Sequence, residues 1–138
     1  MKKALLLTGA LVVLAAAGFL LWYATTPRTP EQYHDRLKAR TGRIPPGDIR
    51  GYQEILDEYE KTETLFERRF PQSDLRDDLA FERIGIVDAR IGDVTRAFDL
   101  YQSFIEEYPD SKHLPRCFYR GAEILLQQKK YLQSIEHF

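Results

Sequence analysis

Apolar residues recur every three or four positions along most of the chain, which is the spacing of one face of an α-helix. No stretch alternates apolar and polar residues for long enough to indicate a β-strand. The clearest helical run follows the Gly92-Asp93 pair and comprises Val94, Ala97, Phe98, Tyr101, Phe104, Ile105 and Tyr108. The pattern predicts an all-α protein with helices at 31–40, 48–70, 76–91, 94–108 and 114–128, and a last one from residue 131.

Changes in composition along the sequence predict three segments. Residues 1–30 form an apolar segment that ends in a proline-containing stop. Residues 31–47 read as a polar connector, in which the short helix carries only Tyr33 and Leu37 as an apolar stripe. Residues 48–138 form the helical domain, and Asp48 is placed to cap its first helix. Because Phe138 falls in the middle of a helical pattern, we expect the last repeat to be incomplete.

The second half of the sequence repeats the same order of small and aromatic positions. Val94, Ala97 and Tyr101 correspond to Tyr131, Ser134 and Phe138, and each of these pairs is separated by 37 residues. A fainter copy lies upstream, because residues 65–73 read like residues 103–111. Repetition at this period indicates helical hairpins that stack on one another.

Residues 79–111 resemble a tetratricopeptide repeat, which is a helix–turn–helix unit of about 34 residues. The matching positions are Phe81, Ile84-Gly85, the turn at Gly92-Asp93, the small residue Ala97, the aromatic Tyr101 and the closing Pro109. Asp88 departs from the pattern, since an aromatic residue is usual at that position. Residues 114–138 resemble a second repeat, with Ala122 and Ser134 in the small positions.

The resemblance implies a solenoid of paired helices. Small residues at Gly85, Ala97, Ala122 and Ser134 would let the paired helices approach closely, while aromatic residues would fill the gaps between successive pairs. The loop lengths and the ending of residues 108–111 look like the envelope branch of the family. That branch includes outer-membrane-assembly lipoproteins, the Tol–Pal-associated periplasmic coordinator and membrane-anchored periplasmic repeat proteins. No cysteine lies near the apolar run, which argues against the lipoprotein subgroup.

An almost unbroken apolar run extends from Ala4 to Ala24 behind a basic N-terminus. About 20 apolar residues are enough to cross a hydrocarbon core of roughly 30 Å, and Trp22 lies where aromatic rings favour the membrane interface. We expect an uncleaved signal-anchor helix in the inner membrane, with the N-terminus inside and the soluble domain in the periplasm. The alternative is a signal peptide that is cleaved after Ala17 or Ala24.

Composition and charge narrow the chemistry. The net charge is −1, and three basic residues and no acidic residue lie in the first 30 positions, so the rest of the protein is more acidic than basic. An acidic domain does not favour phosphate backbones, and we expect no nucleic-acid partner. The single cysteine, Cys117, excludes an intrachain disulfide, a CxxC redox pair and a cysteine-rich zinc site.

We expect no enzyme, no cofactor, no metal and no small-molecule substrate. The sequence has no GxSxG, P-loop, GxGxxG or HExxH motif. His113 lies four residues before Cys117, and such a pair could form a nucleophile. The simpler interpretation is that Cys117 fills a small buried position and that His113 lies in a loop between repeats.

Two surfaces are candidates for binding a protein partner. In the family that the sequence resembles, the first helix of each repeat lines a concave groove. Carried over to this protein, the groove contains Arg83, Arg90, Arg116, Tyr119 and Arg120. Its arginines would form a basic strip for an acidic segment or for the C-terminus of another polypeptide, because guanidinium groups pair bidentately with carboxylates. The alternative is that they pair with nearby acids on the same surface, where exposed ion pairs contribute only about 0–1 kcal/mol. The second surface is the open end of the solenoid, formed by Tyr131, Ile135 and Phe138.

The sequence therefore favours a non-enzymatic, membrane-tethered interaction module or scaffold of the bacterial envelope. The alternative function is an accessory structural subunit of a larger respiratory, photosynthetic or secretion complex, held by its transmembrane helix.

Overall fold

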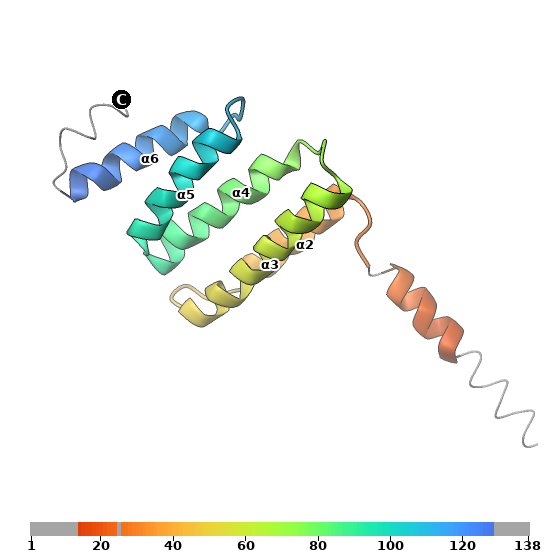
Figure 1. Ribbon diagram of the computed structural model, residues 1–138. Coiled ribbons are helices and arrows are strands. Elements are labelled where there is room, and N and C mark those ends of the chain that lie inside the picture. Colours follow the sequence, from red (N-terminus) through yellow and green to blue (C-terminus); the bar gives the residue numbers. More distant parts are fainter. Residues whose placement is uncertain (1–13, 25, 129–138) are drawn as a thin grey trace, which may run out of the picture.

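The computed structural model describes residues 14–24 and 26–128, and within these ranges the protein is helical with no strand (Figure 1). After a helix at residues 14–24 come α2 (Pro30–Thr41), α3 (Ile49–Arg69), α4 (Leu75–Gly85), the π-helical segment η1 (Ile86–Ile91), α5 (Val94–Glu107) and α6 (Leu114–Gln127). The all-α prediction is confirmed. The predicted single helix at 76–91 is divided, because its last six residues adopt the wider π geometry.

The first hairpin consists of α2 and α3. Thr29 caps α2 by accepting a hydrogen bond from the amide of Gln32, and Pro30 occupies the first helical position, where its missing N–H costs nothing. Asp48 caps α3, as predicted, by accepting from the amide of Gly51. The turn between the helices contains Gly47 at a φ of 88°, a left-handed conformation that favours glycine.

The second hairpin consists of α4, η1 and α5. Gly92 ends η1 at a φ of 78°, and the next residue, Asp93, caps α5 by accepting from the amide of Arg96. This turn lies where the sequence predicts it. The following loop leads into α6, which packs on α5.

The connector predicted at 31–47 contains a helix that packs on the bundle through one face. Helix α2 contacts both α3 and α4, and Leu37 on its inner face is only 4% exposed. Tyr33 packs edge-on against Phe66 and also contacts Phe70 at the far end of α3. Among the residues that the structure describes, the packed array therefore begins at Pro30 and not at residue 48.

The small positions expected between paired helices are only partly confirmed. Ala97 and Ala122 are fully buried, as a close helix–helix contact requires. The expectation for Gly85 was wrong, because a Cβ added there would meet no atom within 4 Å. Ser134 lies outside the described residues.

The predicted anchor is described only in part. Residues 14–24 form a helix that extends away from the bundle, and its large apolar side chains are between 51% and 70% exposed (Figure 1). Within residues 14–24 and 26–128, no helix combines the length and the apolar character that crossing a membrane requires. The rest of the predicted span, at 4–13, lies outside the described residues, as does the open-end surface of Tyr131, Ile135 and Phe138.

Candidate functional site

The candidate site is the side of the array on which side chains of α2 and α6 both reach α4 and η1, here called the α2–α4–α6 face. Its contacts join Lys38 to Glu82, His113 to Asp78 and Arg120 to Asp88. The helix backbones are close within the hairpins, and the backbones of α2 and α4 also approach each other. The polar side-chain contacts add to this packing and link the first helices of successive hairpins.

Glu82 joins the first hairpin to the second. Its Oε1 lies 3.0 Å from Nε2 of His34 and 3.7 Å from Nζ of Lys38, both on α2. Its Oε2 accepts a hydrogen bond of 3.1 Å from the hydroxyl of Tyr59 on α3. Burial, together with the charge of Glu82, raises the pKa of Tyr59, so this hydroxyl stays a donor. One carboxylate on α4 therefore fixes the positions of both helices of the preceding hairpin.

Asp88 joins the second hairpin to α6. Nε of Arg120 lies 2.6 Å from Oδ2 of Asp88, and Nη2 lies 2.8 Å from Oδ1, which makes a bidentate pair. The hydroxyl of Tyr101 donates to the same carboxylate at 3.1 Å. The hydrogen bonds from Arg120 hold the pKa of Asp88 below its ordinary value, so the side chain is a buried anion. Arg120 on α6 and Tyr101 on α5 thus satisfy Asp88, the residue at which the sequence departs from the pattern that it resembles.

A third polar group connects the start of α4 with the loop before α6. His113 Nε2 lies 2.6 Å from Oδ1 of Asp78, and its ring stacks flat on Phe81 at 4.2 Å between centroids. Ser111 donates to Asp77 at 2.7 Å. The ligand atoms of Asp77, Asp78 and His113 lie within 4.8 Å of one another, a spacing that three metal ligands can have.

The same group already contains a cation. The ammonium of Lys112 lies 2.8 Å from Oδ1 of Asp78. Burial alone would raise the pKa of Asp78, but hydrogen bonds from Lys112 and His113 outweigh it and lower the pKa. We therefore interpret the group as a polar contact between α4 and the loop before α6, and not as a metal site.

Two of the five predicted groove residues, Arg83 and Arg120, form ion pairs with carboxylates of the protein. Arg83 points toward α3, where its Nε lies 2.7 Å from Oε1 of Glu63, and its side chain is only 17% exposed. Arg120 is taken up by Asp88 and Glu123. Arg120 pairs with acids on the same surface, as in the alternative interpretation, whereas Arg83 pairs with an acid on α3 that was not predicted.

The other three predicted groove residues are exposed. The guanidinium of Arg116 lies over the ring of Phe81 at 5.6 Å, and that of Arg90 lies over the ring of Tyr52 at 5.9 Å. Tyr119 is 55% exposed on α6. Within the described residues, no carboxylate forms an ion pair with Arg90 or Arg116. Of the four predicted groove arginines, Arg90 on η1 and Arg116 on α6 therefore remain exposed and available to a partner.

Cys117 has the properties of a packing residue. It is fully buried, and burial raises the pKa of its thiol to about 11, which disfavours the reactive thiolate at neutral pH. The nearby histidine does not activate it, because His113 directs Nε2 to Asp78. This geometry agrees with the simpler interpretation of the pair.

Comparison of the sequence and structure with known protein families, with curated proteins and with solved structures gives no match. The family resemblance therefore rests on the repeat pattern alone.

Sequence reasoning missed the contribution of α2 to the site. His34 and Tyr59 were not identified, although both contact Glu82. A signal was present, because His34 lies beside Tyr33 and one turn before Leu37, on the short apolar stripe of this helix. A polar residue on such a stripe needs a buried partner.

Proposed function

We propose that this protein is a non-enzymatic interaction module of the tetratricopeptide-repeat type, tethered to the bacterial inner membrane and presenting its α2–α4–α6 face to a protein partner in the periplasm. The observation that carries the proposal is the position of α4, where Glu82 contacts His34 of α2 on one side and Phe81 contacts Arg116 of α6 on the other. Such an arrangement of first helices is what stacked helical hairpins require. Exposed Tyr119 and Arg116 on α6 supply the aromatic and arginine side chains that are enriched at protein interfaces.

The membrane tether in this proposal is supported by the exposure of the helix at 14–24. Leu14, Leu20 and Leu21 are each at least 65% exposed, and Phe19 and Trp22 are also exposed. Apolar side chains clustered in this way favour a membrane or a protein interface. If the tether is uncleaved, the mature protein keeps Met1 and stays in the membrane pellet after an alkaline wash. An intact mass that lacks about 17 or 24 residues would identify a cleaved signal peptide instead.

The second candidate function, an accessory subunit of a larger membrane complex, is favoured by the same exposed helix, because its apolar surface could pack on other membrane helices. Purification of the full-length protein from its own membranes in mild detergent separates the two functions. A transient module elutes largely alone, and a chemical cross-linker is needed to retain its partner. A subunit elutes with stoichiometric partners that stay bound without cross-linking.

A further inference from the structure

We propose that Arg28 clamps the helix at 14–24 to α2, so that the helical array is held in one orientation relative to the membrane. This inference rests on the proposed membrane tether, and it adds that the tether is stiff. Residues 26–29, which precede α2, make contacts in both directions along the sequence, and Arg28 takes part in both sets.

The backward contacts fix Arg28 to the end of the apolar helix. Its Nη2 donates to the carbonyl oxygen of Tyr23 at 3.3 Å, and its guanidinium carbon lies 3.2 Å from the centre of the Tyr23 ring. The last carbonyls of a helix lack partners within the helix, and an arginine can satisfy them. The cation also gains from the face of the aromatic ring. Thr26 also caps the C-terminal end of this helix, because its amide and its hydroxyl both donate to the carbonyl oxygen of Trp22.

The forward contacts fix the same residue to the start of α2. The amide of Arg28 donates to Oε1 of Gln32 at 2.9 Å, and the amide of Thr29 donates to the same oxygen at 3.4 Å. In return, the amide of Gln32 donates to the hydroxyl of Thr29. This reciprocal capping holds the first turn of α2 and the preceding two residues as one unit.

Residues 26–30 have little backbone freedom of their own. Pro27 is buried and Pro30 is the first residue of α2, and each proline ring fixes one φ angle. Flexible tethers are rich in glycine and serine, and residues 26–30 contain neither. A partner held in the same membrane would then meet the α2–α4–α6 face with little loss of orientational freedom on binding.

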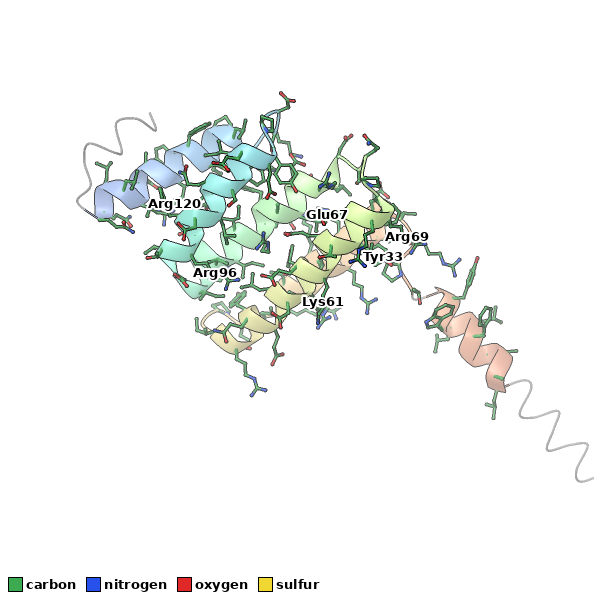
Figure 2. All side chains as sticks on the ribbon, viewed as in Figure 1. Tyr33, Lys61, Glu67, Arg69, Arg96 and Arg120 are labelled. Carbon is green, nitrogen blue, oxygen red and sulfur yellow. The ribbon has the colours of Figure 1, made fainter. Side chains whose placement is uncertain are left out.

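Distances between spin labels in lipid nanodiscs test the clamp on the full-length protein. One label is placed at Gly18→Cys, where an added side chain meets no atom within 4 Å, and the other at Lys61→Cys, which is exposed on α3 (Figure 2). The unsubstituted protein with only Cys117 serves as the background, since that thiol is buried. We expect one narrow distance distribution. Arg28→Ala should roughly double its width, toward the spread of a flexible linker.

The matched control is Arg36→Ala, which removes an exposed arginine from α2 and should leave the width unchanged. Arg28→Lys should keep the narrow distribution, because its ammonium can still lie over the ring and donate to the carbonyl. Gln32→Ala should broaden it, which tests the forward contacts independently of Arg28. Circular dichroism confirms that each variant keeps its helix content.

A broad distribution in the unmodified protein, or equal widths with and without Arg28, would overturn the clamp. Failure of the membrane tether shows up separately. If a water-soluble paramagnetic reagent speeds the relaxation of the spin label at Gly18→Cys, this helix is exposed to water and does not lie in the bilayer. The proposed function then loses its membrane tether, whatever the distance distribution.

Discussion

At the scale of single residues, Asp88 shows how a polar side chain in the core constrains its surroundings. Its carboxylate is satisfied by Arg120 and Tyr101, and its side chain is only 7% exposed. Arg120→Met leaves this anion buried without its main partner, and we expect a loss of about 2–3 kcal/mol in the free energy of unfolding. The measurement is urea denaturation of the full-length protein in detergent micelles.

Two variants control this prediction. Arg116→Met lies one turn earlier on α6, removes an arginine without a carboxylate partner among the described residues, and should change stability by less than about 0.5 kcal/mol. Asp88→Leu combined with Arg120→Met replaces both charged partners by apolar groups and should recover part of the loss, because only the neutral hydroxyl of Tyr101 then lacks its acceptor. If the loss persists in the double variant, the ion pair itself stabilises the fold. The loss in Arg120→Met would then not come from leaving the Asp88 carboxylate buried without a partner.

The same carboxylate predicts a pH dependence. Because the pKa of Asp88 is lower in the folded state than its ordinary value of 3.8, its stabilising effect is fully present above about pH 4 and is lost as the pH falls through the folded-state pKa. The stability of the unmodified protein should therefore fall more steeply below pH 4 than that of the Asp88→Leu/Arg120→Met variant. Parallel curves in thermal melts between pH 5 and pH 2.5 would contradict this.

Gly85 and Ala97 provide a contrast between two small residues that the sequence treats alike. Gly85 faces open space in a helical conformation, so Gly85→Ala should stabilise the protein by about 0.5–1 kcal/mol. Ala97 is fully buried, so Ala97→Leu should destabilise it by about 1–3 kcal/mol through overpacking. The denaturation midpoints of the two variants should move in opposite directions. A loss of stability in Gly85→Ala would restore the close helix contact that the repeat pattern implies.

At the scale of whole elements, the sequence predicts well where the helices lie along the chain. It does not predict which helices pack against one another. The periodicity, the capping residue Asp48 and the turn predicted at Gly92-Asp93 place α3 and α5 correctly. The importance of α2 was missed because its apolar stripe is short, and its packing depends on contacts with α3 and α4 that are distant in sequence. The pairing of Arg83 with Glu63 was missed for the same reason, since the two residues lie on different helices.

The role of α2 leads to a prediction for this element. Leu37→Ala removes a side chain that packs in the core with Tyr52 and Phe66, and we expect a loss of about 2–4 kcal/mol. The matched control is Ala39→Gly on the exposed face of the same helix, which should cost no more than about 1 kcal/mol. If residues 31–47 were only a connector, Leu37→Ala would change the denaturation midpoint no more than the control does.

At the scale of the whole molecule, two packed hairpins and α6 are joined along one face by three polar groups that centre on Asp78, Glu82 and Asp88. Arg116 and Tyr119 lie together on α6, are exposed, and are of the residue types enriched at protein interfaces. We propose that a protein partner binds there.

The most direct measurement is site-specific photo-crosslinking in the native membrane. A benzophenone amino acid at Tyr119 should yield one discrete crosslinked protein, and Arg116→Ala in the same polypeptide should reduce its yield. The same photoreactive residue at Asp99, which is exposed on α5, is the control and should not capture that protein. Equal capture from both positions, or capture at Asp99 alone, would contradict the claim that the α2–α4–α6 face is the binding surface.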